Sequence, residues 1–197
     1  TAYILAEIMI ANNINISGKI DIDRHENKPS LLFYYQGEML KDIIRDNIQY
    51  SRNLVSEILL LHVASRLTCK IDNLTDAANC LNNWYKVRYP NLNWNYLSWH
   101  NGSGLSSSTK LSSIHVLELL KTLDKKSYNQ DYARSFFAIS GVKGTLLNKF
   151  SRNPISVLGK TGNLYFVSNI AGYLNHQGKN YIFVIMINNC LLYTSPS

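Results

Sequence analysis

The sequence has few of the residues that build disulfide frameworks and metal sites. It holds three cysteines in 197 residues, Cys69, Cys80 and Cys190, and neither their odd number nor their wide spacing matches a disulfide scaffold or paired CxxC motifs. We therefore expect buried structural thiols. The five histidines form no HExxH or HxH arrangement, so the sequence predicts no metal and no cofactor.

Long hydrophobic runs are also lacking. The longest, Ile182 to Ile187, is far shorter than the roughly 20 residues that cross a bilayer. No basic flank followed by a hydrophobic stretch opens the chain, so we expect neither a membrane span nor a signal peptide in it. Because it begins with Thr1 rather than Met, we expect a fragment whose natural start lies upstream.

Positive charge is present without clustering. Lys and Arg number 20 against 13 Asp and Glu, for a net charge of +7, but they are scattered singly or in pairs such as Lys125 and Lys126. Nucleic-acid binding needs clustered bases that neutralise phosphates. The pattern argues against a nucleic-acid partner and is compatible with anionic cell-envelope polymers.

An apolar content of 46% is enough for one globular domain. In the first part of the chain, apolar spacing predicts a helix over 5–12 and a short strand over 14–20, followed by a loop over 21–36. It then predicts helices over 40–48 and 54–67 that meet at 50–53.

Capping residues mark two more helices. Thr75 is a suitable N-cap for a helix that ends before Pro90, and Ser112 or Ser113 for another. A Gly- and Ser-rich loop over 101–108 lies between them.

The C-terminal part changes to strand patterns, over 156–165, 167–174 and 180–188. The last strand is apolar on both faces, which predicts cover on both sides of its sheet by the upstream helices. The fold class is α/β, an antiparallel sheet flanked by helices. We expect residues 1–190 to form one domain portion and residues 191–197 to be a tail of uncertain origin.

Two short motifs carry the chemistry. Gly159-Lys160-Thr161 does not fit a P-loop, because Pro154 replaces the required glycine and a strand follows. Lys160-Thr161-Gly162 on a strand, with Ser51-x-Asn53 at a helix junction, instead matches the KTG and SxN motifs of β-lactamases and penicillin-binding proteins. A second SxN at 151–153 lies in the approach to the KTG strand and is discounted.

The surrounding residues make this match specific. The chain resembles, over most of its length, the serine D-alanyl-D-alanine carboxypeptidase family that carries a long insertion between SxxK and SxN. Five segments carry the resemblance in order: SRNLVSEILL at 51–60, NGSGLS at 101–106, SGVKGTL at 140–146, GKTGNL at 159–164 and AGY at 171–173. The implied fold is β-lactamase/transpeptidase-like and incomplete here.

The resemblance implies a role for each motif residue. Lys160 supplies positive potential near the nucleophile, Ser51 relays a proton to the leaving amine, and Asn53 holds the substrate amide. Taken singly, each has a structural alternative: a solvated strand lysine, a helix cap and a turn residue.

The resemblance also implies three substrate-binding residues. Thr161 binds the terminal carboxylate, Gly162 lets the substrate backbone approach closely, and Asn163 helps form the oxyanion hole through its backbone N–H. Asn163 stands where the family usually has Thr, and Asn101 and Lys143 each stand where it usually has Asp. These departures affect loop hydrogen bonds and side-chain contacts.

The nucleophile is the missing part. No SxxK precedes Ser51, and the two later ones, at 107–110 and 140–143, fall in segments that match other family features. We expect the nucleophile upstream of Thr1. The resemblance then implies a periplasmic or envelope enzyme that acts on peptidoglycan stem peptides, by carboxypeptidase or endopeptidase action, with β-lactams as covalent inhibitors.

Two alternatives stay open: a non-catalytic relative that binds peptidoglycan or β-lactams, and a β-lactamase.

In the resembled fold the strand Tyr181–Asn188 pairs with a strand upstream of Thr1. We therefore expect an unpaired apolar strand edge here, which favours aggregation of the isolated chain.

Overall fold

The computed structural model describes residues 2–20, 34–128, 131–150 and 155–189, and the chain divides into two compact units, Thr1–Gly37 and Glu38–Ser197. In the first unit the predicted helix is α1 (Ala2–Ala11), and Asn13, two residues after its end, has a positive φ of 60°. The strand predicted over 14–20 is wrong. That segment forms no strand, because no strand among the described residues of its unit pairs with it.

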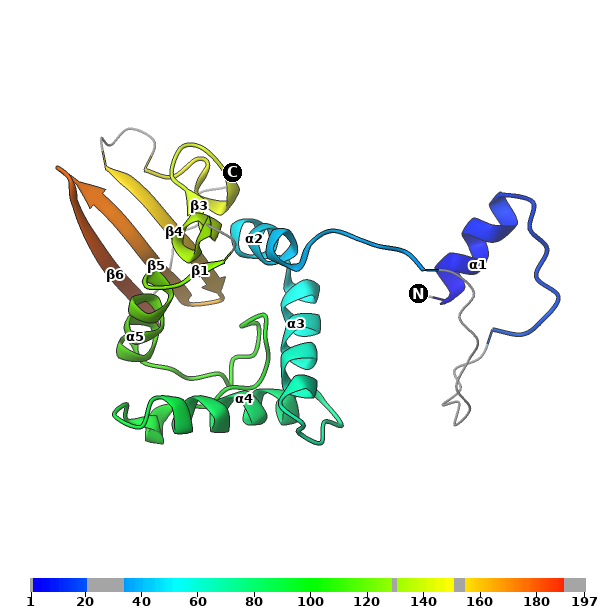
Figure 1. Cartoon of the computed structure of the whole chain (residues 1–197), viewed down its shortest axis with the longest axis horizontal. Coiled ribbons are helices and arrows are strands. Elements are labelled where there is room, and N and C mark those ends of the chain that lie inside the picture. Colours follow the sequence, from blue (N-terminus) through cyan, green and yellow to red (C-terminus); the bar gives the residue numbers. More distant parts are fainter. Residues whose placement is uncertain (1, 21–33, 129–130, 151–154, 190–197) are drawn as a thin grey trace. The chain divides into compact units, whose positions relative to one another are not determined.

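The second unit begins with the two helices predicted to meet near residue 51. They are α2 (Leu40–Tyr50) and α3 (Asn53–Arg66), and they run in different directions from their junction (Figure 1). The spacing placed both helices, but the residues they bury are Asn47 and Gln49 in α2 and Leu60 and Ala64 in α3. Leu54 and Ile58, on which the prediction rested, are exposed. The loop predicted over 21–36 lies outside the described residues except for its last three.

Two further helices follow, α4 (Leu74–Arg88) and α5 (Ser113–Asp124). The cap of α4 is Asn73 rather than Thr75: its side chain accepts a hydrogen bond of 3.0 Å from the backbone N–H of Asp76. Ser112 caps α5, as one of the two predicted serines. Short 3-10 turns connect the elements: η1 (Trp94–Tyr96), η2 (Ala133–Phe136) and η3 (Gly144–Leu146).

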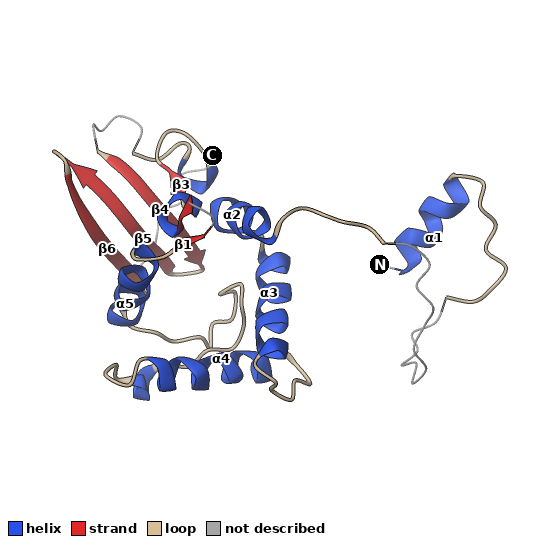
Figure 2. Cartoon of the chain, in the orientation of Figure 1, coloured by secondary structure: helices blue, strands red, loops and turns tan. Residues whose placement is uncertain are grey.

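The sheet is antiparallel, with the strand order β3-β4-β5-β6 (Figure 2). The three predicted strands are confirmed as β4 (Ser156–Leu164), β5 (Val167–His176) and β6 (Lys179–Asn188). The fourth strand, β3 (Ala138–Ile139), pairs with the first half of β4. A separate two-stranded hairpin is formed by β1 (Ser127–Tyr128) and β2 (Asp131–Tyr132).

Helix α5 covers one face of this sheet (Figure 1). Leu120, Phe137 and Tyr173 form a buried cluster there, and the Tyr173 hydroxyl donates a 2.8 Å hydrogen bond to the backbone oxygen of Leu120. Burial, together with the negative charge of the neighbouring Asp124, raises the pKa of Tyr173 to about 12, although Arg134 acts in the opposite direction. Tyr173 therefore fixes α5 to the middle of the sheet.

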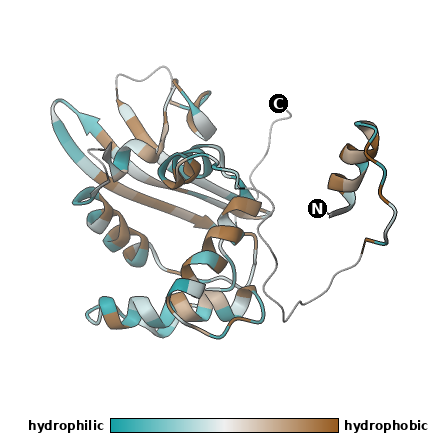
Figure 3. Ribbon diagram, turned by 45° about the vertical axis from the view of Figure 1, so that its right-hand side comes forward, coloured by the Kyte–Doolittle hydropathy of each residue, from teal (hydrophilic) through white to brown (hydrophobic). Residues whose placement is uncertain are grey.

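The opposite face of β6 is covered only in part, where Phe183 packs against the buried cluster of Ala138, Leu146 and Val157. Ile182 and Val184 pack toward the cluster under α5, but Tyr181, Ile185 and Ile187 are 47%, 51% and 42% exposed. Figure 3 shows the apolar residues distributed along the sheet and the helices. Among the described residues β6 is also an edge strand, which agrees with the predicted unpaired edge.

A second core cluster joins α3 to α4 through the buried side chains of Leu60, Ala64, Ala77, Ala78 and Cys80. The expectation of free thiols is wrong here, because Cys69 and Cys80 form a disulfide with a Cα–Cα distance of 6.2 Å. The turn between the helices brings together two cysteines that lie 11 residues apart. Cys190, the second SxN at 151–153 and the boundary after residue 190 lie outside the described residues.

Two features are absent from the described ranges. None of their helices is long and apolar enough to cross a bilayer, and they bring no three His, Cys, Asp or Glu side chains together in a way that could hold a metal ion.

Candidate active site

The site begins at the turn between α2 and α3. Ser51 is the C-cap of α2 and has left-handed backbone angles, φ 58° and ψ 54°. Its N–H donates a 2.9 Å hydrogen bond to the backbone oxygen of Asn47. Because this conformation is uncommon for a residue other than Gly, the surroundings must hold it in place. Asn53 follows as the first residue of α3 and is exposed.

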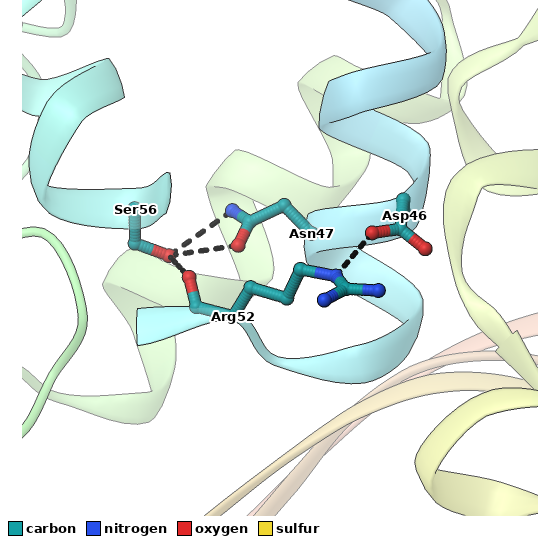
Figure 4. Close-up of polar contacts among 4 residues, drawn as sticks. All are labelled: Asp46, Asn47, Arg52 and Ser56. Carbon is teal, nitrogen blue, oxygen red and sulfur yellow. Dashed lines mark hydrogen bonds and ion pairs between the residues drawn. The ribbon is translucent and has the colours of Figure 1, made fainter. Parts of the chain in front are cut away.

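Side chains on both sides of the turn hold it (Figure 4). Asn47, which is buried, donates a 3.0 Å hydrogen bond from Nδ2 to the Oγ of Ser56. Arg52 forms an ion pair with Asp46. These two contacts cross from α2 to α3, so they fix the turn on which Ser51 sits.

Lys160 reaches this turn from β4. Its Nζ donates 2.8 Å hydrogen bonds to the Oγ of Ser51 and to the backbone oxygen of Thr161. Ser51 and Lys160 are 109 residues apart in the sequence, and they are two of the three predicted catalytic residues. Burial lowers the pKa of Lys160 from its usual value, and partial removal from water strengthens the field of its charge at Ser51.

The backbone of β4 presents hydrogen-bonding groups beside this contact. Both main-chain groups of Val157 bond to Ser140 on the β3 side. The side of a strand to which the main-chain N–H and C=O groups point alternates from one residue to the next. The N–H and C=O groups of Thr161 and Asn163 therefore point to the same side as those of Val157. Among the described residues no strand pairs with Lys160–Leu164 on that side, which we call the β4 edge.

The other predicted substrate-binding residues lie along this edge. A Cβ built on Gly162 would meet no atom within 4 Å, so the space beside its backbone is open to a ligand. The Asn163 side chain turns to the neighbouring strand instead, where its Oδ1 accepts a 3.1 Å hydrogen bond from Ser168. Asn163 therefore contributes its backbone, rather than its side chain, to the β4 edge, and the role that the resemblance implies for it also uses the backbone.

The segment that contains Gly144 holds α2 against the sheet. Gly144 has φ +73°, and a Cβ there would lie 2.6 Å from the backbone oxygen of Gln49 and 2.8 Å from the Cβ of Ala138. The buried side chain of Gln49 also donates a 3.4 Å hydrogen bond to the backbone oxygen of Phe137. Only glycine permits this close approach, which places the end of α2, and so Ser51, beside β4.

Glu57, which no motif marks, connects α3 to the loop around Gly102. Its carboxylate accepts hydrogen bonds from the Gly102 N–H (2.7 Å), the Ser103 hydroxyl (2.5 Å) and N–H (3.2 Å), and the Asn101 side chain (3.1 Å). Burial by itself would raise the pKa of Glu57, but these donors together lower it below its usual value. Glu57 thus ties the loop to the first turns of α3.

The departure at position 101 is compatible with this arrangement. Asn101 Nδ2 donates to Glu57 and also, over 2.9 Å, to the Oγ of Ser103. An ionised Asp at this position could only accept hydrogen bonds and would repel the Glu57 carboxylate. The only sequence signal for Glu57 was its place inside the segment at 51–60.

Two features lie away from these residues. A mostly apolar cavity of about 250 Å³ lies against the loop around Gly102, with Tyr85, Trp94 and Trp99 in its wall, and none of the six predicted site residues lines it. Ser140, from one of the later SxxK patterns, is bonded to Val157 in the sheet through both its N–H and its Oγ.

The chain is similar to several proteins of known structure. It matches penicillin binding protein 4 from Haemophilus influenzae, crystallised with a novel β-lactam, at 23% identity and a TM-score of 0.79, over 100% of this chain and 45% of that one. It also matches a penicillin G-acylated predatory endopeptidase from Bdellovibrio bacteriovorus, solved with an immunity protein, at 16% identity and a TM-score of 0.61, over 76% and 38%. This chain therefore spans less than half the length of these proteins.

A search of curated proteins gave no match. The mixed fold of helices and an antiparallel sheet is that of these penicillin-binding proteins, as predicted. The family model for D-Ala-D-Ala carboxypeptidase 3 (S13) matches residues 2–196, nearly the whole chain. The chain belongs to the D-Ala-D-Ala carboxypeptidase 3 (S13) family.

Proposed function

We propose that this chain supplies the SxN and KTG parts of a serine D-Ala-D-Ala carboxypeptidase or endopeptidase that cleaves peptidoglycan stem peptides through an acyl-enzyme. The observation that carries the proposal is the 2.8 Å hydrogen bond from Lys160 to Ser51. It joins two motifs that are distant in the sequence, within a chain that matches the family along its length. The nucleophile is a serine of an SxxK motif N-terminal to this chain.

The geometry suggests how a proton reaches the leaving group. Lys160 Nζ donates to the Oγ of Ser51, so the hydroxyl hydrogen of Ser51 points elsewhere and can be donated to the departing amine. Ser51 then recovers a proton from Lys160, whose lowered pKa favours its release. The C–N bond of the substrate breaks as the oxygen of the nucleophilic serine bonds to the carbonyl carbon, and the proton that this serine loses replaces the one given up by Lys160. Water later hydrolyses the ester.

The β4 edge provides the substrate-binding groups. The peptide lies along this edge, its terminal carboxylate bound by Thr161, its carbonyl oxygen close to the Asn163 N–H, and its backbone passing over Gly162. Asn53 holds the substrate amide from the start of α3. β-Lactams enter the same site as covalent inhibitors, as the crystal complexes of the two similar proteins suggest.

We propose an envelope or periplasmic location. Family membership supports it, and so does the Cys69–Cys80 disulfide, because disulfides persist in oxidising compartments such as the bacterial periplasm. Peptidoglycan is the partner, and neither nucleic acid nor metal is required.

The test uses the full-length protein, meaning the longest native product of the reading frame that contains this chain. Release of D-alanine from a peptide ending in D-Ala-D-Ala is measured for the wild type, Ser51→Ala and Lys160→Ala. We expect each substitution to lower the rate by about 100-fold or more, as for loss of a general acid. Ser65→Ala, an exposed serine on α3, is the matched control. Wild-type rates in both site variants would refute the proposal.

A further inference from the structure

The cavity against the loop around Gly102 has aromatic rings in its wall. Tyr85, Tyr89, Trp94 and Trp99 line it, and we call these four residues the aromatic wall. The ring centroid of Tyr85 lies 5.9 Å from that of Tyr89, 6.5 Å from that of Trp94 and 5.9 Å from that of Trp99, with interplanar angles of 23°, 30° and 35°. The four rings therefore form one continuous surface with Tyr85 at its centre.

The two tryptophans of the aromatic wall are fixed by hydrogen bonds at their edges. The indole N–H of Trp94 donates a 2.8 Å hydrogen bond to the backbone oxygen of Tyr89. The indole N–H of Trp99 donates one of the same length to the backbone oxygen of Asn101. The rings are thus held in place before a ligand arrives, which lowers the entropy cost of binding one.

The size of the cavity limits what it can hold. Small-molecule pockets usually enclose roughly 300–1,000 Å³ and are lined by apolar and aromatic side chains with a few polar groups. This cavity encloses about 250 Å³, at the small end of that range. It therefore suits a ligand of one or two rings rather than a long chain.

A few polar side chains share the lining. Ser98, Thr109 and Lys110 all line the cavity, and Ser98 and Lys110 are joined by an antiparallel backbone bridge that closes the loop between them. The Oγ1 of Thr109 accepts a 3.3 Å hydrogen bond from the backbone N–H of His100, so its hydroxyl hydrogen can be donated to a ligand. The cavity thus combines aromatic faces with hydrogen-bonding groups.

The charges at the cavity argue against a cationic ligand, although aromatic faces attract cations. Residues 77–117 contain no Asp or Glu, and Lys110 adds a positive charge to the lining. Glu118 also lines the cavity, but its carboxylate is paired with Lys121 over 2.6 Å. A wholly aliphatic ligand would leave the polar groups of Thr109 and Lys110 without a partner. An uncharged ring with an apolar C–H face and a polar edge fits both parts of the lining, and a sugar has this form.

We propose that this cavity binds one N-acetylated hexose of a glycan strand. The C–H face of the sugar stacks on the aromatic wall, and its hydroxyl or acetamide groups bond to Thr109 and Lys110. Gly102 and Ser103 also line the cavity, and both bond to Glu57 on α3, so the sugar site and the α2–α3 turn share one loop. The choice of sugar rests on the proposed function, because the stem peptides of peptidoglycan are attached to such a strand.

The experiment titrates a β-1,4-linked tetramer of N-acetylglucosamine into the full-length protein by isothermal titration calorimetry. We expect a Kd of about 1 mM. Tyr89→Leu keeps an apolar side chain in the wall but removes a ring face, and should weaken binding by about fivefold. Thr109→Val removes the hydroxyl at nearly the same volume and should weaken it by about threefold. Tyr96→Leu, at a tyrosine that is 77% exposed on η1 and outside the lining, is the matched control and keeps the wild-type Kd.

Three results would overturn the sugar site. They are the same Kd in Tyr89→Leu, Thr109→Val and the wild type, no heat of binding at about 10 mM tetramer, and tighter binding of tetramethylammonium than of the tetramer. Intact-mass analysis of the wild type with a β-lactam separates this inference from the proposed function. An adduct without tetramer binding would overturn the sugar site alone, whereas tetramer binding without an adduct would overturn the proposed function alone.

Discussion

The two halves of strand β4 differ although they belong to one continuous element. Ser156–Gly159, which we call the core half, lies between β5 and the segment that includes β3. Lys160–Leu164, the edge half, pairs with β5 alone among the described residues. A Cβ at Gly159 would touch neighbouring atoms at 3.3 and 3.4 Å, whereas one at Gly162 would meet nothing within 4 Å. Neighbouring atoms therefore fill the space around the core half, whereas the space beside the edge half is open.

The comparison also explains why the edge half is well positioned without being enclosed. The core half is fixed by buried contacts such as those of Val157 with Ala138 and Leu146. The edge half extends from it and is joined to the α2–α3 turn through Lys160 and Ser51. Rigid support on one side and open backbone on the other suit the proposed binding of an extended peptide.

The largest effect is expected at Lys160. Lys160→Ala in the full-length protein removes the donor to Ser51 and lowers the rate of β-lactam acylation by about 100-fold or more, about 3 kcal/mol in the barrier. Stopped-flow kinetics with a chromogenic β-lactam measures this rate. Lys179→Ala, an exposed lysine on β6, is the control. The free energy of unfolding should stay unchanged in Lys160→Ala, since burial already disfavours the charge of Lys160. A loss of about 3 kcal/mol in unfolding free energy, as large as the effect on the acylation barrier, would mean that Lys160 has a structural role.

The core half should respond through stability. Gly172 faces Gly159 across the sheet, and a Cβ there would lie 2.0 Å from the backbone oxygen of Leu158. We expect Gly172→Ala to lower the unfolding free energy by about 2–3 kcal/mol, measured by urea titration. A loss below about 0.5 kcal/mol would show that the sheet is not so closely packed.

A substitution of Glu57 tests whether the loop at Asn101–Ser103 stabilises the part of the structure that faces the edge half. Glu57→Gln should lower the unfolding free energy by about 1–2 kcal/mol at pH 7, because the loop loses hydrogen bonds to a charged acceptor. The folded-state pKa of Glu57 is lowered, so its contribution is present above about pH 4.5 and is lost as pH falls through the folded pKa. Urea titrations at pH 7 and pH 3 should show the difference between the two proteins shrinking in acid. A constant difference would contradict this account.

The smallest effect is expected at Gly162, the counterpart of Gly172 in the edge half. Gly162→Ala should change the unfolding free energy by less than about 0.5 kcal/mol, because the new Cβ meets no atom. It should still slow β-lactam acylation by about fivefold, about 1 kcal/mol, since it occupies space that the ligand uses. Urea titration and acylation kinetics on the same preparation separate the two outcomes. A fall in stability equal to that of Gly172→Ala would end the contrast between the halves.

Periodicity predicted most of the fold from the sequence. The helices near Leu40 and Leu54 and the three long strands lie where the spacing of apolar residues predicts them. The strand predicted over 14–20 failed because alternation shows only that a segment can pair, and none of the described strands pairs with it. Burial of both faces of β6 failed for a similar reason, since Ile185 and Ile187 are apolar without being covered.

Only those residues of the candidate site that belong to short motifs could be predicted from the sequence. Ser51 and Lys160 were predicted because SxN and KTG are motifs with a known chemistry, and a hydrogen bond joins the two side chains in the structure. Glu57 was not found, since a carboxylate on a helix has no sequence signature for the backbone amides that it binds 45 residues away. The Cys69–Cys80 pair was missed because its proximity depends on the turn between α3 and α4.

The most direct test of the central claim is an intact-mass measurement after incubation with a β-lactam, followed by peptide mapping. The full-length protein and this 197-residue chain are treated side by side. The account predicts one covalent adduct on the full-length protein, at a serine N-terminal to Thr1, and none on the shorter chain. An adduct at Ser107 or Ser140, or no adduct on either protein, would contradict it.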